Sequence, residues 1–276
     1  MGPDFAPPAR MTHATHRDKP PTASPLHIGC AGWALSSNVA ARFPSQGSHL
    51  ERYARIFPAV EINSSFYRSH QPKTYARWSE SVSDAFRFSV KIPQTVSHEL
   101  RLRDADAAMS AFVAEIAPLG EKLACLLLQL PPSLAFEKSA AHEFFALVCG
   151  LTNTRVVCEP RHATWFTDEA AQTLIDGGVA CVRAHPPPVA GVEPVGDPRT
   201  LYIRLHGSPR IYYSAYDEPF IEAVAARIVE ARNSGADVWC IFDNTAHGEA
   251  LPNALMLMEK LEKAAGSPAA VVIASQ

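Results

Sequence analysis

The chain has 276 residues, of which 47% are hydrophobic and 19% are charged, and its formal net charge at pH 7 is −3. A chain of this length and apolar content can bury a large core as one or two domains. The small net charge gives no general attraction to nucleic acid or to an anionic membrane surface, so we expect neither as a partner.

The first 25 residues differ in composition from the rest of the chain. They are rich in proline and polar residues and lack the apolar segment of a secretory signal, which predicts a disordered N-terminal tail over 1–25. Beyond this tail, no apolar run approaches the roughly 18 residues that span a bilayer. The six cysteines occur singly, as is typical of buried reduced thiols. These features predict a soluble cytoplasmic protein with a folded part over 26–266 and a short C-terminal tail over 267–276.

Eight short runs rich in apolar, β-branched and aromatic residues follow one another along the chain and are predicted strands. They cover 27–33, 59–67, 87–93, 124–131, 154–160, 179–185, 201–207 and 237–244. Most of the segments between them have apolar residues at helical spacing, and several end at glycine. This alternation indicates a parallel sheet covered by helices, and eight units favour a single (β/α)8 TIM-type barrel over a doubly wound sheet.

One crossover departs from this alternation. The stretch "PPPVAGVEPVGDPR", between the sixth and seventh predicted strands, contains five prolines. Proline lacks a backbone N–H and clashes with the preceding turn of a helix, so this stretch cannot be a regular helix. The sequence therefore predicts a Pro-rich loop in place of this crossover helix.

Polar or amphipathic side chains occur at the carboxyl end of every predicted strand. In chain order they are Trp33, Glu61, Asn63, Lys91, Gln129, Glu159, Arg161, His162, His185, Arg204, His206, Asp243 and Asn244. In an α/β barrel these ends surround one concavity, where catalysis almost always takes place. Charges that face inward there must pair or bind a ligand, because an unpaired buried charge costs several kcal/mol.

The alternation of side chains along a strand indicates which of these residues converge. Glu61, Lys91, Glu159, Arg204 and His206 fall on positions that face inward together. We expect Glu61 to pair with Lys91 on the neighbouring strand. We also expect Arg204 in the upper interior and His206 at the mouth, within reach of a carboxylate of the fifth or eighth strand.

The chain also carries a series of motifs that resemble a known family. They are "IGCAGW", "VEINSSFYRSHQPKTYARW", "FRFSVKIPQTVSH", "LLLQLPPSL", "VVCEPRHATW", "YIRLHG" with "YYSAY", and "CIFDN". As a set, they resemble the domain-of-unknown-function-72 family, the YecE-like proteins, which implies a TIM-type barrel without an established activity. The resemblance implies that the recurrent polar positions are Trp33, Glu61, Asn63, Tyr67, Lys91, Gln129, Glu159, Arg161, His162, Arg204, His206 and Asn244. The chain departs from the family at His185, where an acidic residue is frequent, and at Asp243, where asparagine is common.

The first functional hypothesis is an enzyme that acts on a small anionic substrate without a redox cofactor, as a hydrolase, lyase or isomerase. The candidate catalytic residues are Glu159, His206, Lys91 and Glu61. Glu159 and His206 suit acid-base chemistry, whereas Lys91 suits either a Schiff-base nucleophile or a cation that binds phosphate or carboxylate. The candidate substrate-binding residues are Trp33, Asn63, Tyr67, Gln129, Arg161, His162, Arg204, Asp243 and Asn244.

Two further hypotheses stay open at this point. In the second, a divalent metal ion such as zinc or manganese is held by Glu159, His185, His206 and Asp243, although nearby cations would oppose it. In the third, the chain is a non-catalytic ligand-binding or interaction protein. The sequence contains no G-x-G-x-x-G, Walker or G-x-S-x-G motif, which removes the usual support for dinucleotide, P-loop and α/β-hydrolase chemistry. The oligomeric state is left open.

Overall fold

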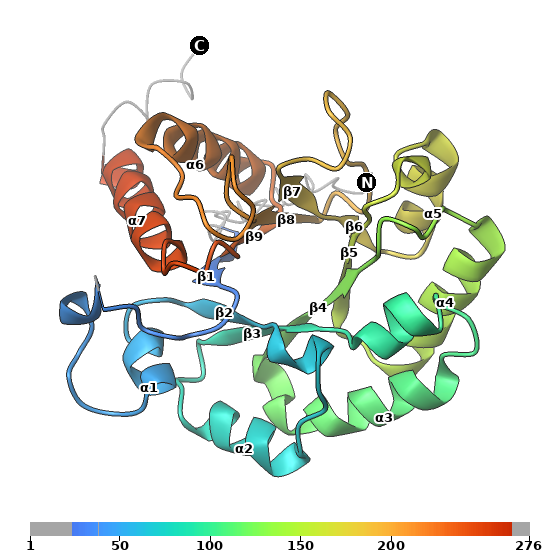
Figure 1. The fold of residues 1–276 in the computed structure, drawn as a ribbon, viewed down its shortest axis with the longest axis horizontal. Helices are drawn as coiled ribbons and strands as arrows, with labels where there is room; N and C mark the ends of the chain where they lie inside the picture. The colour runs from blue at the N-terminus through green and yellow to red at the C-terminus, as the bar shows by residue number, and fades with distance from the viewer. Residues whose placement is uncertain (1–23, 38, 267–276) are drawn as a thin grey trace, which may run out of the picture.

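The computed structural model describes residues 24–37 and 39–266 (Figure 1). The predicted tails, 1–25 and 267–276, lie outside these residues except for Ser24 and Pro25. The carbonyl oxygen of Ser24 accepts a hydrogen bond from Arg232 Nε at 3.0 Å, and that of Pro25 accepts one from Val238 N at 3.1 Å. These two residues are therefore tied to the folded part of the chain.

The described residues form nine strands in two parallel sheets, with the orders β1-β9-β8-β7 and β2-β3-β4-β5-β6. The strands are β1 (Leu26–Cys30), β2 (Ala59–Ile62), β3 (Arg87–Lys91), β4 (Leu123–Gln129), β5 (Arg155–Glu159), β6 (Ala180–Cys181), β7 (Arg183–His185), β8 (Thr200–Leu205) and β9 (Asp237–Phe242). Each predicted strand is present. The sixth is divided into β6 and β7, which are separated by Val182 alone.

Seven α-helices of the described residues lie outside the strands, as Figure 1 shows. They are α1 (His49–Ala54), α2 (Pro72–Glu80), α3 (Asp106–Ile116), α4 (Lys138–Leu151), α5 (Asp168–Asp176), α6 (Glu218–Asn233) and α7 (Ala250–Gly266). Side-chain caps fix several of their starts: Ser48 and Glu51 form a reciprocal capping box at α1, and Asp217 accepts from Phe220 N at α6. None of the described helices combines the length and apolar content that a bilayer crossing requires.

The two sheets approach each other between β1 and β2. There the hydroxyl of Tyr53 bonds to backbone groups of both strands, in place of direct backbone hydrogen bonds between them. Cys30 N donates to Tyr53 Oη at 2.8 Å, and Tyr53 Oη donates to the carbonyl oxygen of Ala59 at 2.9 Å. Gly29 permits this approach, because a Cβ atom there would lie 2.1 Å from the Ala59 oxygen. A tyrosine from a helix thus satisfies backbone groups on both edge strands.

One stretch of chain connects the two sheets on their other side. β6 pairs with β5 in one sheet and β7 pairs with β8 in the other. At the β1 and β2 edges, a single bridge pair joins Ala31 to Glu61. The sequence predicted one continuous barrel, whereas the hydrogen-bonded strands form two parallel sheets in an α/β fold. Between β7 and β8, residues 186–199 contain turns and bends and no helix.

The strands bury apolar side chains on both faces. One large cluster lies between the strands and the helices. A second, smaller cluster lies between the two sheets and consists of Ala59, Cys125, Leu127, Val157, Ala180, Val182, Tyr202, Trp239 and Ile241. Because inward positions recur every second residue, the next inward positions toward the carboxyl ends include Glu61, Glu159 and Arg204. The fold therefore places a charged layer directly above an apolar one.

Candidate active site

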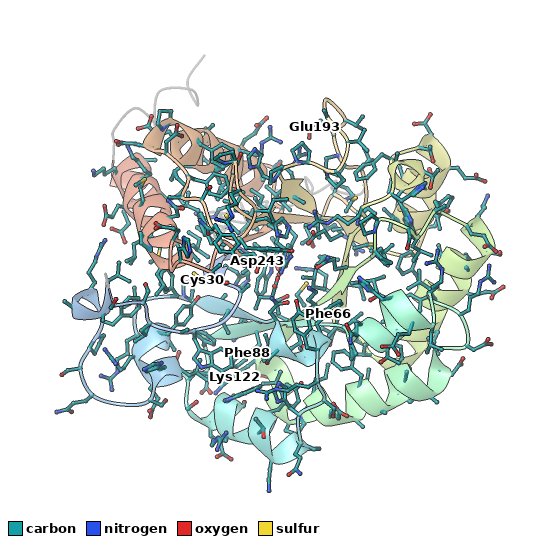
Figure 2. The ribbon with its side chains drawn as sticks, viewed as in Figure 1. Cys30, Phe66, Phe88, Lys122, Glu193 and Asp243 are labelled. Atoms are coloured by element: carbon teal, nitrogen blue, oxygen red, sulfur yellow. The ribbon has the colours of Figure 1, made fainter. Side chains whose placement is uncertain are left out.

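Five titratable side chains gather at the carboxyl ends of the strands. Glu61 belongs to β2, Glu159 to β5 and Arg204 to β8, while His206 and Asp243 follow β8 and β9. Each residue is at most 4% exposed. Figure 2 shows Asp243 between the strands of the two sheets. The structure brings these side chains together, as the inward strand positions of Glu61, Glu159, Arg204 and His206 predicted. Asp243 was predicted only as a polar residue at the end of the eighth strand within reach of His206.

Arg204 is the centre of this buried cluster. Its Nη2 lies 2.7 Å from Glu61 Oε1 and 3.1 Å from Asp243 Oδ2. Its Nη1 lies 3.2 Å from Glu159 Oε2. Burial opposes the charge of Arg204, but the three carboxylates outweigh it and hold the pKa of Arg204 well above its usual value. The predicted role of Arg204 in substrate binding stays a prediction, since its guanidinium is directed here at carboxylates of the protein.

Glu61 is held by partners other than the predicted one. Arg204 donates to both of its oxygens, and Tyr202 Oη donates to Oε2 at 2.9 Å, with Ser89 Oγ 2.9 Å from the same hydroxyl. The predicted ion pair between Glu61 and Lys91 is wrong. The strand register places Glu61 opposite Ser89, so Lys91 lies one inward position closer to the mouth. Glu61 is therefore engaged entirely inside the protein, and no contact among the described residues supports its predicted catalytic role.

His206 lies between two carboxylates. Its Nε2 is 3.0 Å from Glu159 Oε1 and its Nδ1 is 2.9 Å from Asp243 Oδ2. Burial opposes protonation of His206, but Glu159 and Asp243 outweigh it and raise its pKa. The pKa of Glu159 is shifted in the opposite direction. Burial alone would raise it, but Arg204, His206 and Arg161 hold the pKa of Glu159 well below its usual range.

Arg161 imposes a choice on the His206 ring. Its Nη2 lies 2.8 Å from His206 Nε2 and also contacts Glu159 Oε1. A guanidinium only donates hydrogen bonds, so Nε2 must accept from Arg161 while this contact exists, and the ring proton then lies on Nδ1 and is donated to Asp243. If His206 is protonated, Nε2 donates to Glu159 and Arg161 must move away. The protonation of His206 and the position of Arg161 are therefore linked.

Lys91 lies above this cluster and is 4% exposed. Its Nζ sits 3.9 Å from the centre of the Phe66 ring, a favourable cation-π position. Among the described residues, no carboxylate oxygen lies within the 4.0 Å of an ion pair with Lys91. Burial, with a smaller contribution from Arg204, lowers the pKa of Lys91 to about 8. Lys91 is thus a buried cation that its surroundings do not neutralise by direct contact.

The loop after β8 covers His206 and was not predicted as part of the site. Tyr212 N donates to the carbonyl oxygen of His206 at 2.5 Å, and the two rings meet edge to face at 5.9 Å. Asn244 braces the same loop by donating to the carbonyl oxygen of Ser214 at 3.1 Å, while its own Oδ1 is buried without a hydrogen-bond partner among the described residues. The motif "YYSAY" was the only signal in the sequence that could have indicated Tyr212.

The remaining predicted binding residues surround the mouth. Trp33 and Asn63 line a cavity there, although Asn63 follows β2 in a helical conformation, where strand alternation no longer applies. Tyr67 is 68% exposed, Gln129 is half-buried beside Glu159 in the strand register, and His162 caps a short turn. No hydrogen bond among the described residues joins Tyr67, Gln129 or His162 to the buried cluster.

The predicted metal-binding set is not assembled. In the part of the chain that the structure describes, no group of three or more His, Cys, Asp or Glu residues is arranged to hold a metal ion. Of the four predicted ligands, His185 pairs in register with Leu205, which faces the helices, so His185 has the outward parity. The other three surround Arg204, whose positive charge opposes a cation.

The comparisons with known proteins agree with the motifs. The family model described as "Protein of unknown function DUF72" matches residues 27–273. UPF0759 protein YecE of Escherichia coli strain K12 is 34% identical over 175 residues, which cover 61% of this chain and 62% of that protein. UPF0759 protein YunF of Bacillus subtilis strain 168 is 23% identical over 274 residues, which cover 86% of this chain and 95% of that protein.

Solved structures show the same fold. A crystal structure of a DUF72 family protein from Thermotoga maritima has a TM-score of 0.73 at 24% identity and covers 86% of this chain and 99% of that one. A DUF72 family protein from Enterococcus faecalis also has a TM-score of 0.73, at 19% identity, with coverage of 86% and 95%. The family match confirms the resemblance found in the motifs and spans most of the chain, and the protein therefore belongs to the DUF72 family of proteins of unknown function.

Proposed function

We propose that the protein is an enzyme that binds a small phosphate- or carboxylate-bearing substrate beside Lys91 and Arg161. The observation that carries this proposal is the environment of Lys91. Its ammonium group is buried without an ion pair among the described residues, whereas Arg204 and Arg161 each contact a carboxylate. A buried charge without a partner is costly to retain, and a bound anion supplies the missing partner.

The proposed site requires that the two sheets together form one closed (β/α)8 barrel. In this arrangement β6 and β7 are one interrupted strand, and the Pro-rich stretch 186–199 takes the place of one helix. The Tyr53 hydroxyl and the Ala31–Glu61 bridge support closure at the β1 and β2 edges. Closure gives the strands one common mouth, and the ion pair between Glu61 of one sheet and Arg204 of the other supports it.

The charge balance of the site favours coupled binding of an anion and a proton. Besides His206, the cluster and its rim contain three carboxylates and the three cations Lys91, Arg161 and Arg204. The site is therefore balanced when His206 is neutral. An incoming anion adds negative charge, which protonation of His206 offsets.

Arg161 couples these two events. With Arg161 in place, His206 Nε2 is occupied and the ring is neutral. When a bound anion draws Arg161 away, Nε2 becomes available to take a proton from the substrate. Glu159, 3.0 Å from Nε2, stabilises the resulting imidazolium, and Asp243 keeps the Nδ1 proton in place. His206 then acts as general base and returns the proton as general acid.

Calorimetric titration with inorganic sulfate tests this proposal. Near pH 7 sulfate is a dianion that does not titrate, so proton uptake measured in two buffers of different ionisation enthalpy comes from the protein. We expect wild-type protein to bind sulfate with proton uptake and His206→Asn to bind it without uptake. Lys91→Gln should weaken binding about tenfold or more, because a charge-assisted contact is lost.

A matched control is Lys122→Gln. Lys122 is a half-buried lysine that donates to the carbonyl oxygens of Ser79 and Val82, and Figure 2 labels it outside the ring of strands. This variant should bind sulfate as the wild type does. Absence of sulfate binding, or equal binding by Lys91→Gln, would refute the proposal. Binding without proton uptake would instead support a protein that binds an anion without acid-base chemistry.

A further inference from the structure

A cavity of about 780 Å³ opens beside the buried cluster, at the carboxyl ends of β1 and β2 and the loop after β9. Its lining includes Cys30, and Figure 2 shows Cys30 beside Asp243. Burial raises the pKa of the Cys30 thiol, and the negative charge of Asp243 makes a smaller contribution in the same direction. Polar and aromatic side chains that line the cavity are Trp33, Ser36, Ser37, His49, Asn63, Ser64, Thr245 and His247. The volume lies within the range of small-molecule sites.

Residues that line the cavity are close along the chain to residues of the proposed anion site. Asn63 lines the cavity, and its carbonyl oxygen accepts a hydrogen bond from Phe66 N at 3.2 Å in the same short turn. The ammonium group of Lys91 in turn lies over the ring of Phe66. On the opposite side, Thr245 of the cavity follows Asp243 by two residues. Lys91 and Arg161 do not themselves line the cavity, but its lining is joined to Lys91 through this short turn and to Asp243 through two residues of chain, and we take the anion site to lie next to it.

The chemistry of the cavity differs from that of the cluster. None of its lining residues is Asp, Glu, Lys or Arg, so it offers no fixed charge to a ligand. It offers hydroxyl, amide and imidazole groups, which exchange hydrogen bonds with uncharged polar groups. Such a lining suits a neutral ligand with many hydroxyl groups better than a second anion or a purely apolar group.

Two side chains sharpen this assignment. The Trp33 ring is half-buried and held edge to face against Trp78 at 5.0 Å, so it presents a fixed apolar surface of the kind that packs against the C–H face of a sugar. Asn63 Oδ1 is buried and has no hydrogen-bond partner among the described residues. An unsatisfied buried acceptor is costly, and a hydroxyl donor would relieve that cost after a small movement of the amide.

We infer that this cavity binds the uncharged, hydroxyl-rich part of the substrate, which makes the substrate a sugar or polyol that carries a phosphate or carboxylate. This inference rests on the proposed function, since the anionic group lies at Lys91. The cavity determines which anion is preferred, while Lys91 and Arg161 provide attraction to any anion.

Equilibrium binding of a defined probe panel tests the inference. The probes are inorganic phosphate, glycerol 3-phosphate, ribose 5-phosphate, glucose 6-phosphate and the corresponding unphosphorylated compounds. At least one phosphorylated probe should bind about tenfold or more tightly than inorganic phosphate, because it fills both parts of the site. Trp33→Ala should remove this advantage and leave phosphate affinity unchanged, whereas Trp33→Phe should retain it.

A second variant covers the case in which Trp33→Ala does not fold. Thr245→Val removes a cavity hydroxyl without changing volume and should also reduce the advantage of the phosphorylated probe over phosphate. If phosphate binds through Lys91 but no phosphorylated probe binds more tightly, the inference fails and the proposed function stands. The inference also fails if both cavity variants keep the preference. If wild-type protein binds no phosphate or sulfate, both fail together.

Discussion

Replacing Lys91 with methionine should stabilise the protein while weakening anion binding. Methionine retains the length and apolar volume of the lysine side chain but removes its charge. The surroundings lower the pKa of Lys91 from 10.5 to about 8, mainly through burial and despite the opposing carboxylates. At ~1.36 kcal/mol per pKa unit, charging this lysine in the folded state costs about 3 kcal/mol.

The pH dependence of this effect has a definite sign. The folded-state pKa of Lys91 is lower than the unfolded-state value, so the penalty is fully present below about pH 8 and disappears as pH rises through 10.5. Urea unfolding of wild-type and Lys91→Met protein should therefore differ by up to about 3 kcal/mol near neutral pH and converge at high pH.

Lys122→Met provides the matched control for this prediction. The ammonium group of Lys122 donates to the carbonyl oxygens of Ser79 and Val82, so the same substitution there leaves two acceptors without their donor. It should lower the free energy of unfolding by about 1–3 kcal/mol. The reasoning is refuted if Lys91→Met is less stable than the wild type at neutral pH, or if its gain in stability persists unchanged at high pH.

Three further substitutions test other parts of the structure. Arg204→Met leaves three carboxylates buried without their shared cation, so urea unfolding should show a loss of about 3–5 kcal/mol or no folded protein, and a near-neutral effect would contradict this. Tyr53→Phe keeps the ring but orphans Cys30 N and the Ala59 carbonyl, so the free energy of unfolding should fall by about 1–3 kcal/mol for each group. His206 has a raised folded-state pKa, so its contribution to stability is fully present below pH 6.5 and is lost as pH rises through the higher folded-state value. The difference in unfolding free energy between wild type and His206→Asn should thus shrink with rising pH, and a difference that grows would count against the His206 environment.

Strand alternation predicted the shared inward face of Arg204 and His206. Arg204 and His206 are two residues apart on a buried strand, so they must share a face, and the structure places both in the cluster. Alternation fixes the face but not the height of a residue relative to the neighbouring strand. The register sets Glu61 opposite Ser89, and strand alternation does not encode this register, so the predicted partner Lys91 was wrong.

Other features depended on contacts that a sequence pattern does not encode. Tyr53 reads as one more apolar position of a helix, yet its hydroxyl bridges two edge strands and separates the sheets. His185 was assigned to the site because it ends a predicted strand, but Val182 interrupts that strand and the register turns His185 outward. Tyr212 lies on an irregular loop, where neither helical nor strand periodicity applies.

The affinity of the protein for inorganic sulfate, measured between pH 6 and 10 at constant ionic strength, tests the role of Lys91 most directly. Sulfate keeps its charge over this range, so changes in affinity report on the protein. His206→Asn is the background for this measurement, because it removes the pH dependence that proton uptake by His206 adds. With the pKa of Lys91 at about 8, the affinity of His206→Asn should fall by up to about tenfold per pH unit above that value, and the double variant with Lys91→Gln should bind weakly without this step. Affinity of His206→Asn that stays constant to pH 10, or a step that survives in the double variant, would show that the anion does not bind at Lys91.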